Sequence, residues 1–290
     1  MPSKPDPDKS PEQTEGRLVL VATPIGNLAD VTLRALDTLR SVDIIAAEDT
    51  RHTRKLLSRY DIHKPLVSYH EHNARERGAQ LLDKIAAGKS VAVVTDAGTP
   101  GISDPGALLV EEALKRGISP VAVPGPTAMI AALVLSGLPV QPFAFLGFAP
   151  ARGAERRRFF EENGALPMTL VLYESPKRLL KTLRDILDSW GGRRVAVARE
   201  LTKIHEEVFR GTVSEALAHF EAAETKGEIT LVVEGRPAPE ASAPEEAGWR
   251  DELDAMLAAG ASLKEAASAV AARFSLPRRT VYQAALDKKR

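Results

Sequence analysis

Short runs of β-branched and aliphatic residues alternate with segments of helical period from Arg17 onward. In the first half of the chain the runs are Leu18–Ala22, Asp43–Ala47, Ser90–Thr95 and Ser119–Val123. The intervening segments repeat apolar residues every three or four positions, at Val31–Leu39, Thr50–Tyr60, Arg75–Ala87, Gly106–Arg116 and Pro126–Ser136. Such alternation predicts βαβ units and a parallel sheet covered by helices, and Asp30 is the expected N-cap of the first helix.

A turn-rich connector at Ser136–Pro142 separates this half from a second α/β run. We expect strands at Phe143–Gly147, Met168–Tyr173, Arg194–Arg199, Glu207–Arg210 and Ile229–Glu234, with helices at Gly153–Glu162, Pro176–Trp190 and Ser214–Ala222. The strand at Glu207–Arg210 follows its predecessor too closely for a helical crossover, so part of the second sheet should be antiparallel.

The two ends of the chain differ in composition from the α/β part. Residues 1–16 are polar and Pro-rich and predict a disordered tail, and residues 237–247 read as a Pro/Ala/Glu linker. Residues 248–290 predict a small helical tail whose helices, Ser262–Phe274 and Arg278–Leu286, resemble a helix-turn-helix. The expected order is thus tail, α/β domain (17–137), α/β domain (138–236), linker and helical tail.

The composition excludes several classes of protein. Lys plus Arg and Asp plus Glu each number 39, so a uniformly basic binder of nucleic acid is excluded, although local basic patches are not. Cysteine is absent, which excludes disulfides, thiolate metal sites and a Cys nucleophile. The N-terminus has no apolar segment like that of a signal peptide, and the longest apolar stretches, such as Met129–Leu135, are too short to span a bilayer. We therefore expect a soluble cytoplasmic protein.

Several familiar motifs are imitated but not matched. Gly88-Lys89-Ser90 resembles the end of a P-loop, but the position of the upstream glycine is Asp83. No G-x-G-x-x-G follows the first strand, which disfavours a dinucleotide-binding Rossmann domain. His70 and His72 lie close together, but no further ligands are specified, so we expect no metal site.

Three Gly- and Pro-rich loops follow strands of the first domain. They are Thr23–Leu28, the eleven-residue Asp96–Gly106, and Pro124–Ala128. Ligands of open α/β sheets bind outside the carboxyl ends of the strands, and glycine lets the backbone approach a ligand closely. The length of the second loop exceeds that of a simple connection, so we expect the three loops to form a ligand site.

These loops carry a resemblance to a known family. T-P-I-G-N-L at 23–28, A-E-D-T-R at 47–51, S-Y-H-E-H-N at 68–73, T-D-A-G-T-P-G-I-S-D-P-G at 95–106 and P-G-P-T-A at 124–128 resemble the tetrapyrrole methylase superfamily, and within it the branch that methylates 16S ribosomal RNA. The second domain agrees through L-Y-E-S-P-K-R at 172–178, R-E-L-T-K at 199–203 and G-E-I-T-L-V-V-E at 227–234.

The resemblance implies a two-domain α/β fold that binds S-adenosylmethionine, folded, in the cleft between the domains. By position in the motifs, the implied cofactor-binding residues are Pro24, Ala97, Gly98, Thr99, Ile102, Ser103, Thr127, Ala128, Tyr173 and Leu201. The corrin and sirohaem branches have a G-x-G-x-G-D first loop. Thr23–Asn27 replaces it here, which argues against a tetrapyrrole substrate.

Methyl transfer to a ribose hydroxyl requires alignment of donor and acceptor and removal of a proton from a weak acid. Cysteine is absent and the histidines are poorly arranged. The candidate bases are therefore Glu200 and a desolvated Lys203, with Arg199 holding a phosphate. A set of surface ion pairs at a strand end is the alternative interpretation of these residues.

Three basic clusters lie near the expected cleft and favour a phosphate track over simply solvated faces. Their proposed RNA-binding residues are Arg51 and Arg54, Arg156 and Arg157, and Lys177 and Arg178. Residues 273–290 add six basic side chains against one acid. The implied partner is small-subunit ribosomal RNA, without a membrane, and a homodimer is compatible with the resemblance.

Three functions remain open at this point. The first, which the resemblance implies, is 2′-O-methylation of a cytidine ribose in the decoding region of 16S ribosomal RNA. The second is methylation of a tetrapyrrole by the same cofactor. The third is a non-enzymatic ribosome-assembly factor that uses the fold to clamp RNA.

Overall fold

The computed structural model describes residues 16–222, 224–237, 246–274 and 276–287. The chain forms two compact units, the first ending at Arg236 and the second beginning at Pro237. The tail expected at residues 1–16, apart from Gly16, and most of the linker expected at 237–247 lie outside the described residues.

The first sheet contains five strands in the order β3-β2-β4-β1-β5. Their bounds are β1 Leu18–Val21, β2 Ile44–Ala47, β3 Leu66–Ser68, β4 Val91–Val94 and β5 Val121–Val123. Every neighbouring pair is parallel, which confirms the predicted parallel sheet. β3 was not predicted, because three residues directly after Pro65 are too few to show a periodicity.

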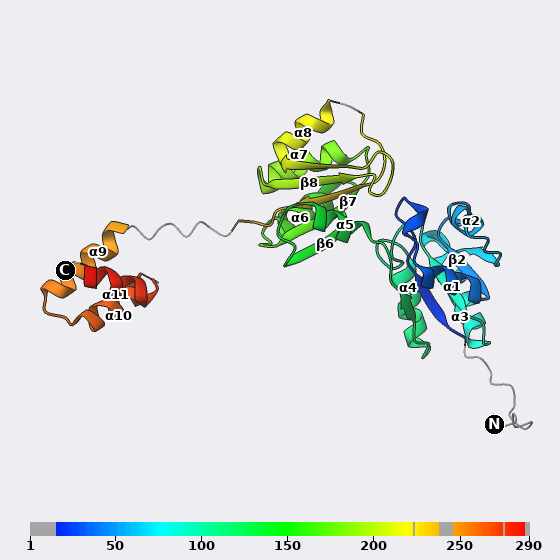
Figure 1. Cartoon of the computed structure of the whole chain (residues 1–290), viewed down its shortest axis with the longest axis horizontal. Coiled ribbons are helices and arrows are strands. Elements are labelled where there is room, and N and C mark those ends of the chain that lie inside the picture. Colours follow the sequence, from blue (N-terminus) through cyan, green and yellow to red (C-terminus); the bar gives the residue numbers. More distant parts are fainter. Residues whose placement is uncertain (1–15, 223, 238–245, 275, 288–290) are drawn as a thin grey trace, which may run out of the picture. The chain divides into compact units, whose positions relative to one another are not determined.

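Helices cover both faces of this sheet, because alternate residues of each strand point to opposite sides (Figure 1). Val19 and Val21 of β1 pack with α1 (Leu33–Ser41) and α2 (Thr50–Arg59). Leu18, on the other face, packs with α3 (Ala74–Ala86) and α4 (Gly106–Lys115).

The expected N-cap at Asp30 is wrong. Asp30 ends a short 3₁₀ helix, η1 (Leu28–Asp30), and α1 begins three residues later. Thr32 caps α1, because its backbone is extended and its hydroxyl accepts a hydrogen bond from the Ala35 N–H at 3.1 Å. A second 3₁₀ helix, η2, spans Glu71–Asn73.

The second sheet also has five strands, in the order β6-β7-β10-β8-β9. They are β6 Phe143–Phe148, β7 Thr169–Glu174, β8 Arg194–Arg199, β9 Glu207–Thr212 and β10 Ile229–Val233. β6 and β7 are parallel, whereas β10 is antiparallel to β7 and β8, and β8 is antiparallel to β9. The prediction of a partly antiparallel sheet is confirmed.

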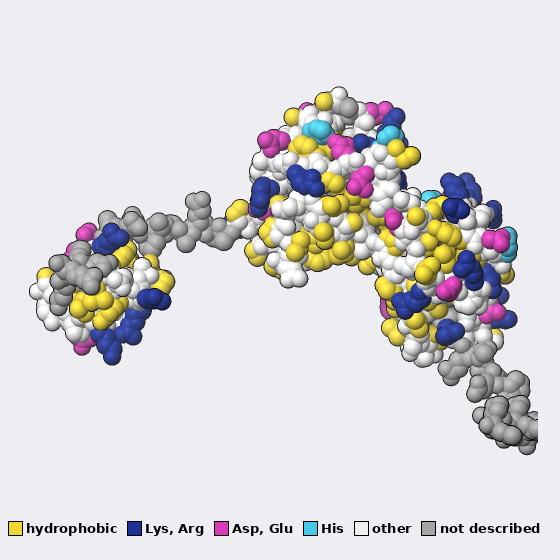
Figure 2. Space-filling view, viewed as in Figure 1, with side chains coloured by type: hydrophobic (Ala, Val, Ile, Leu, Met, Phe, Trp, Pro, Cys, Tyr) yellow, Lys and Arg dark blue, Asp and Glu magenta, His cyan; other side chains and the backbone are white. Residues whose placement is uncertain are grey.

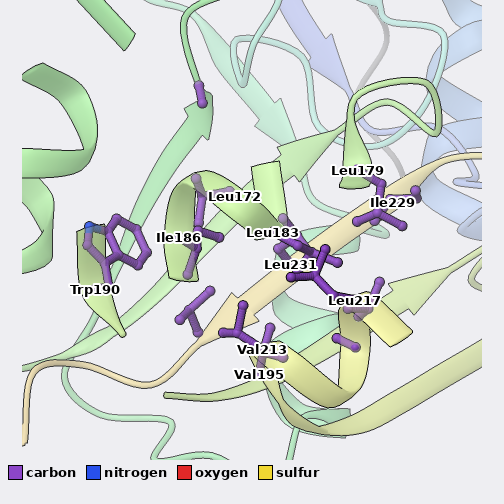
Figure 3. Close-up of a cluster of buried hydrophobic side chains, with 14 of the residues drawn as sticks. Leu172, Leu179, Leu183, Ile186, Trp190, Val195, Val213, Leu217, Ile229 and Leu231 are labelled. Atoms are coloured by element: carbon purple, nitrogen blue, oxygen red, sulfur yellow. The ribbon is translucent and has the colours of Figure 1, made fainter. Parts of the chain in front are cut away.

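Three helices bury one face of the second sheet: α6 (Gly153–Gly164), α7 (Leu179–Trp190) and α8 (Val213–Glu221). Figure 3 shows this core, in which Leu172 and Leu231 from the strands meet Leu183 and Ile186 from α7. The opposite face is covered by α5 (Ala128–Leu135), which directly follows the third loop of the first domain. α5 therefore ties the first domain to the second.

The second unit consists of three helices: α9 (Glu246–Ala258), α10 (Leu263–Arg273) and α11 (Arg278–Asp287). Trp249 and Leu253 of α9 pack against Val270 and Val281 of α10 and α11 in a core of their own. The predicted pair of helices, α10 and α11, is present. α9 was not predicted, because it directly follows the acidic Pro/Ala/Glu segment. None of the helices among the described residues is long and apolar enough to cross a membrane.

Candidate functional site

The three Gly- and Pro-rich loops meet at one edge of the first sheet, because β1 lies between β4 and β5. Thr23 and Gly98 exchange backbone hydrogen bonds of 2.9 and 3.1 Å, which join the first loop to the second. The Thr99 hydroxyl donates to the Pro126 carbonyl at 3.5 Å and joins the second loop to the third. The expected convergence of the loops is confirmed.

The long second loop is held in shape by Asp104. Its carboxylate accepts hydrogen bonds from the backbone N–H of Gly101 at 2.9 Å and of Gly106 at 2.7 Å. Burial raises the pKa of Asp104, although these hydrogen bonds act to lower it. Gly98 and Gly101 have φ values of +84° and +92°, and Ser103 reaches +66° without being glycine. Strain of this kind persists where the surrounding structure enforces it, commonly at binding sites.

A cavity of about 370 Å³ lies between the loops and the second sheet. Six of the ten predicted cofactor residues line it: Ala97, Ile102, Ser103, Ala128, Tyr173 and Leu201. Its size is typical of a small-molecule site.

The other four predicted cofactor residues lie in the same loops but do not line this cavity. Gly98 and Thr127 directly adjoin the lining residues Ala97 and Ala128, and Thr127 hydrogen-bonds to Tyr173. Thr99 is two residues from Ala97. Burial raises the pKa of Tyr173, so its hydroxyl remains protonated where it meets the third loop. Pro24 lines a second, smaller cavity of about 230 Å³.

Sequence reasoning missed the carboxylates of the cavity: Glu48, Asp96, Glu174 and Glu228 all line it. The Thr95 hydroxyl donates to Glu48 Oε2 at 2.7 Å, and the Asp49 N–H donates to Asp96 Oδ1 at 2.9 Å. Burial raises the pKa of Asp96, and the nearby charge of Glu48 adds to the effect. Two of these acids were visible in the sequence as polar residues at strand ends: Glu48 directly follows β2, and Asp96 is the second residue after β4.

Glu200 and Lys203, the predicted bases, form an ion pair of 2.8 Å, and Lys203 also lies 3.2 Å from Glu228. Partial burial lowers the pKa of Lys203, but the carboxylates of Glu200 and Glu228 outweigh burial and the net shift is upward. Burial raises the pKa of Glu200, but hydrogen bonds from Lys203 and the Glu228 backbone outweigh burial and the net shift is downward. The pair is thus ionised at neutral pH, and Lys203 is a cation rather than a desolvated base.

Arg199, the third predicted catalytic residue, points its guanidinium at Glu207. Arg199 Nη2 lies 2.8 Å from Glu207 Oε2, and His219 bonds the other oxygen of the same carboxylate. Of the three described residues Arg199, Glu200 and Lys203, only Lys203 lines a cavity, and it is the smaller one.

The six predicted RNA-binding residues differ in exposure. Arg51 and Arg54 on α2, Arg157 on α6 and Lys177 before α7 are exposed. Arg178 donates to the carbonyls of Ala149 and Pro150 and is only partly exposed.

The RNA-binding role expected for Arg156 is wrong. Its side chain is 4% exposed, and its guanidinium donates to Asp185 at 2.7 Å, Thr182 at 2.9 Å and the Pro150 carbonyl at 2.9 Å. Arg156 therefore joins α6 to α7. The run of arginines at 156–158 did not reveal in the sequence that the side chain of Arg156 is buried.

No group of His, Asp and Glu side chains that could hold a metal ion occurs among the residues that the structure describes. S-adenosylmethionine, by contrast, suits the larger cavity. Ile25, Ile102 and Leu201 offer apolar surface for a flat purine ring. Glu48 offers a carboxylate to ribose hydroxyls or to the positive charges of the cofactor.

Replacing Gly98 by valine should weaken cofactor binding at least tenfold. A Cβ at Gly98 would lie 3.5 Å from Ile25 Cγ2 and 3.6 Å from the Pro126 carbonyl, so the two γ-methyl groups would displace one loop or the other. Gly117→Val is the matched control, because Gly117 has a similar φ of +75° but no atom within 4 Å of its Cβ. Calorimetric titration with S-adenosylmethionine measures the effect. Equal affinity of the two folded variants would contradict this placement of the site.

Comparison with known protein families gives two matches. The family described as Tetrapyrrole (Corrin/Porphyrin) Methylases matches residues 17–217. The family described as RsmI C-terminal HTH domain matches residues 249–289.

Solved structures with this fold include a cobalt precorrin-4 methyltransferase, with a TM-score of 0.58 and 18% identity over 78% of this chain and 97% of that one. A diphthine synthase has a TM-score of 0.59 and 14% identity over 75% of this chain and 89% of that one. At these identities the likeness concerns the fold alone.

The curated relatives share far more sequence. Proteins named ribosomal RNA small subunit methyltransferase I from Halalkalibacterium halodurans and Bacillus subtilis are 47% and 44% identical, over 92% and 93% of this chain and 94% of each relative. The protein of that name from Thermotoga maritima is 52% identical over 76% of this chain and 99% of its own length. The chain therefore belongs to the tetrapyrrole methylase family and, within it, to the branch of the ribosomal RNA small subunit methyltransferases I.

Proposed function

We propose that this protein transfers a methyl group from S-adenosylmethionine to the ribose 2′-hydroxyl of a cytidine in the decoding region of 16S ribosomal RNA. The observation that carries the proposal is that named relatives match more than nine tenths of the chain, while the methylase family model covers residues 17–217, which contain the loops around the cavity. We place the reaction in the cytoplasm, where small ribosomal subunits are assembled.

The cofactor, when bound, supplies a methyl group activated by a positively charged sulfur. The residues of the chain hold and orient the reactants and exclude water, which is where most of the rate enhancement of such a displacement arises. The loops suit this role because Asp104, the Thr23–Gly98 backbone pair and the Thr99–Pro126 hydrogen bond fix them before any ligand enters.

Glu200 and Lys203 contribute by positioning rather than by removing a proton. The turn that contains them packs closely on the first loop: a Cβ at Gly26 would lie 2.6 Å from Lys203 Cγ, and the Asn27 N–H donates to the Thr202 hydroxyl at 3.0 Å. The Glu200–Lys203 ion pair braces this turn, in which Glu200 and Thr202 both have positive φ. Arg199 holds the adjoining strand end through Glu207.

Exposed cations supply the expected contacts with RNA phosphates. Figure 2 shows Lys and Arg side chains gathered where α2 lies in Figure 1, and α2 carries Arg51 and Arg54. Arg157 and Lys177 provide further exposed charges beside the second sheet. A protein with no net charge can bind RNA in this way at one place without being basic overall.

The tetrapyrrole alternative has less support. The first loop, Thr23–Leu28, is packed against Thr202 and Lys203 and lacks the glycines and the aspartate of the corrin and sirohaem branches. The relatives with 44 to 52% identity carry the ribosomal RNA name, whereas the uroporphyrin methyltransferase of similar fold is 22% identical. A purely structural assembly factor would have no use for the cofactor cavity.

The helical second unit serves, in this proposal, as an auxiliary RNA grip. A shallow hollow is lined by Lys264 at the start of α10 and by Arg278, Arg279 and Tyr282 of α11. Figure 2 shows dark blue side chains on the outer surface of this unit. The basic side chains counted in the sequence include Lys288–Arg290, which lie outside the described residues.

A protein that ends at Arg236 should bind S-adenosylmethionine normally but bind RNA roughly 10²-fold more weakly, because a tethered second grip multiplies affinity. The slope of log affinity against log salt should also become shallower. The Thermotoga relative supports this division, because 99% of its length matches only 221 residues, or 76%, of this chain. Calorimetry and RNA titrations at several salt concentrations measure both effects. Loss of cofactor binding on truncation would instead assign the second unit a structural role.

Replacing the target ribose by deoxyribose should abolish methyl transfer while changing RNA affinity by less than about tenfold, because only one hydroxyl group is lost. The assay is transfer of radiolabelled methyl groups to reconstituted small-subunit RNA, with a neighbouring deoxyribose as control. Methyl groups on the deoxy substrate would disprove 2′-O-methylation and favour methylation of the base.

We also propose a homodimer that covers α5. This helix is apolar on every side, yet Ile130 and Val134 are 39% and 67% exposed on the side away from the second sheet. Helices of this kind are normally buried all round, and an isologous interface would bury this one. Sedimentation should show a dimer that Val134→Glu dissociates and that Leu33→Glu, at an exposed leucine of α1, leaves intact. A monomeric parent protein would refute the dimer.

A further inference from the structure

The smaller cavity shares a wall with the cofactor cavity. Both are lined by Ile25, Thr95, Asp96, Ala97 and Glu228. These residues come from the first loop, from the segment after β4 and from the turn before β10, so the shared wall lies at the edge of both sheets. Cavities that share lining residues adjoin, and ligands bound in them can meet along the edge of this wall.

The outer wall of the smaller cavity has the chemistry of a nucleotide site. Lys55, Lys203 and His52 line it, and Lys203 is held as a cation by Glu200 and Glu228. Pro24 and Leu28 add apolar surface on which a flat base can lie. α2, which carries His52 and Lys55, is also the helix that presents the exposed Arg51 and Arg54. A polynucleotide whose phosphates pair with Arg51 and Arg54 along α2 would thus reach this cavity.

Asp96 stands on the shared wall with one carboxylate oxygen free. Oδ1 accepts the Asp49 N–H at 2.9 Å, and none of the described residues donates a hydrogen bond to Oδ2. Glu228 also lines both cavities, but its carboxylate is paired with Lys203. Glu48 accepts from Thr95 and lines only the cofactor cavity.

We propose that the smaller cavity receives the acceptor nucleotide and that Asp96 accepts the proton of its 2′-hydroxyl. The inference rests on the proposed function and adds to it the place of the acceptor and the identity of the base. As the hydroxyl proton passes to Asp96, the ribose oxygen forms a bond to the methyl carbon. The carbon–sulfur bond breaks with its electron pair left on sulfur, so the sulfonium becomes a neutral sulfide. Asp96 then returns the proton to water.

The electrostatics of Asp96 agree with this role. Burial raises its pKa, the charges of Glu48 and Asp49 raise it further, and the Asp49 N–H and His52 act in the opposite direction. A carboxylate with a raised pKa is a stronger base than one held by ion pairs, such as Glu200.

The same shift has a consequence for stability. Because the folded protein disfavours the charged form of Asp96, ionisation of this residue costs stability above the pKa of the unfolded chain. Asp96→Asn keeps an oxygen for the Asp49 N–H and removes the charge. The variant should therefore be at least as stable as the parent at pH 7, and the difference should vanish as the pH falls toward the ordinary value of 3.8.

The test uses the full-length protein in single turnovers with excess enzyme over small-subunit RNA. Asp96→Asn should slow methyl transfer by about 10²–10⁴-fold, the usual contribution of a positioned base. Its affinities for S-adenosylmethionine and RNA should stay within about threefold of the parent, and its melting temperature at pH 7 should be equal or higher. Glu224→Gln, which removes one charge at an exposed site, should change none of these quantities.

Amide hydrogen exchange locates the acceptor without measuring activity. S-adenosylhomocysteine alone should slow exchange in residues 97–103. Adding an oligoribonucleotide of the decoding region should then slow exchange in residues 23–28 and 52–56. Lys55→Ala should weaken the second effect and leave the first unchanged.

Each contrary result has a distinct meaning. Transfer by Asp96→Asn at the parental rate would rule out Asp96 as the base, and a parallel loss of cofactor affinity would make it a cofactor ligand instead. RNA that leaves residues 23–28 and 52–56 unprotected would place the acceptor elsewhere. A parent protein that binds the cofactor but methylates no ribosomal RNA would disprove the proposed function, and this inference with it.

Discussion

The position of β1 between β4 and β5 is the constraint from which the rest of the site follows. Parallel strands end at the same edge, so the loops after these three strands are brought together from positions about a hundred residues apart in the sequence. The antiparallel backbone pair between Thr23 and Gly98 joins the loop after β1 to the loop after β4. The protein itself thereby holds these loops together, and a ligand does not have to order them.

The second domain completes the site because α5, which begins at the third loop, packs against the second sheet and so holds that sheet next to the loops. Ile25 of the first loop joins the same apolar cluster, together with Leu201 and Val232. The turn at 200–203 presses on Gly26 from the other side. Each cavity is therefore lined by residues of both domains. Acidic groups lie inside, at Glu48 and Asp96, and cations lie outside along α2, which suits a positively charged donor and a polyanionic acceptor.

Much of the architecture could be predicted from the sequence because hydrophobic periodicity and loop chemistry are local signals. The parallel sheet, the antiparallel part of the second sheet and the meeting of the three loops were predicted in this way. The failures have physical reasons. β3 is too short to show a period, and Thr32 competed with Asp30 as a cap. Periodicity cannot show which arginine of a run turns inward, as Arg156 does, or that Lys203 meets two carboxylates from distant positions. Asp96 was placed in its loop, but its position between two cavities depends on tertiary structure.

The central claim is that the cavity formed by the loops and the second sheet serves 2′-O-methylation of small-subunit ribosomal RNA. Mass-spectrometric mapping of 16S ribosomal RNA from cells with and without this gene tests it most directly. The account predicts that one cytidine of the decoding region carries a ribose methyl group in the parent cells and lacks it in the deletion strain. It also predicts that the group returns with the parent gene but not with the Gly98→Val variant. An unchanged pattern of ribose methylation in the deletion strain would contradict the account.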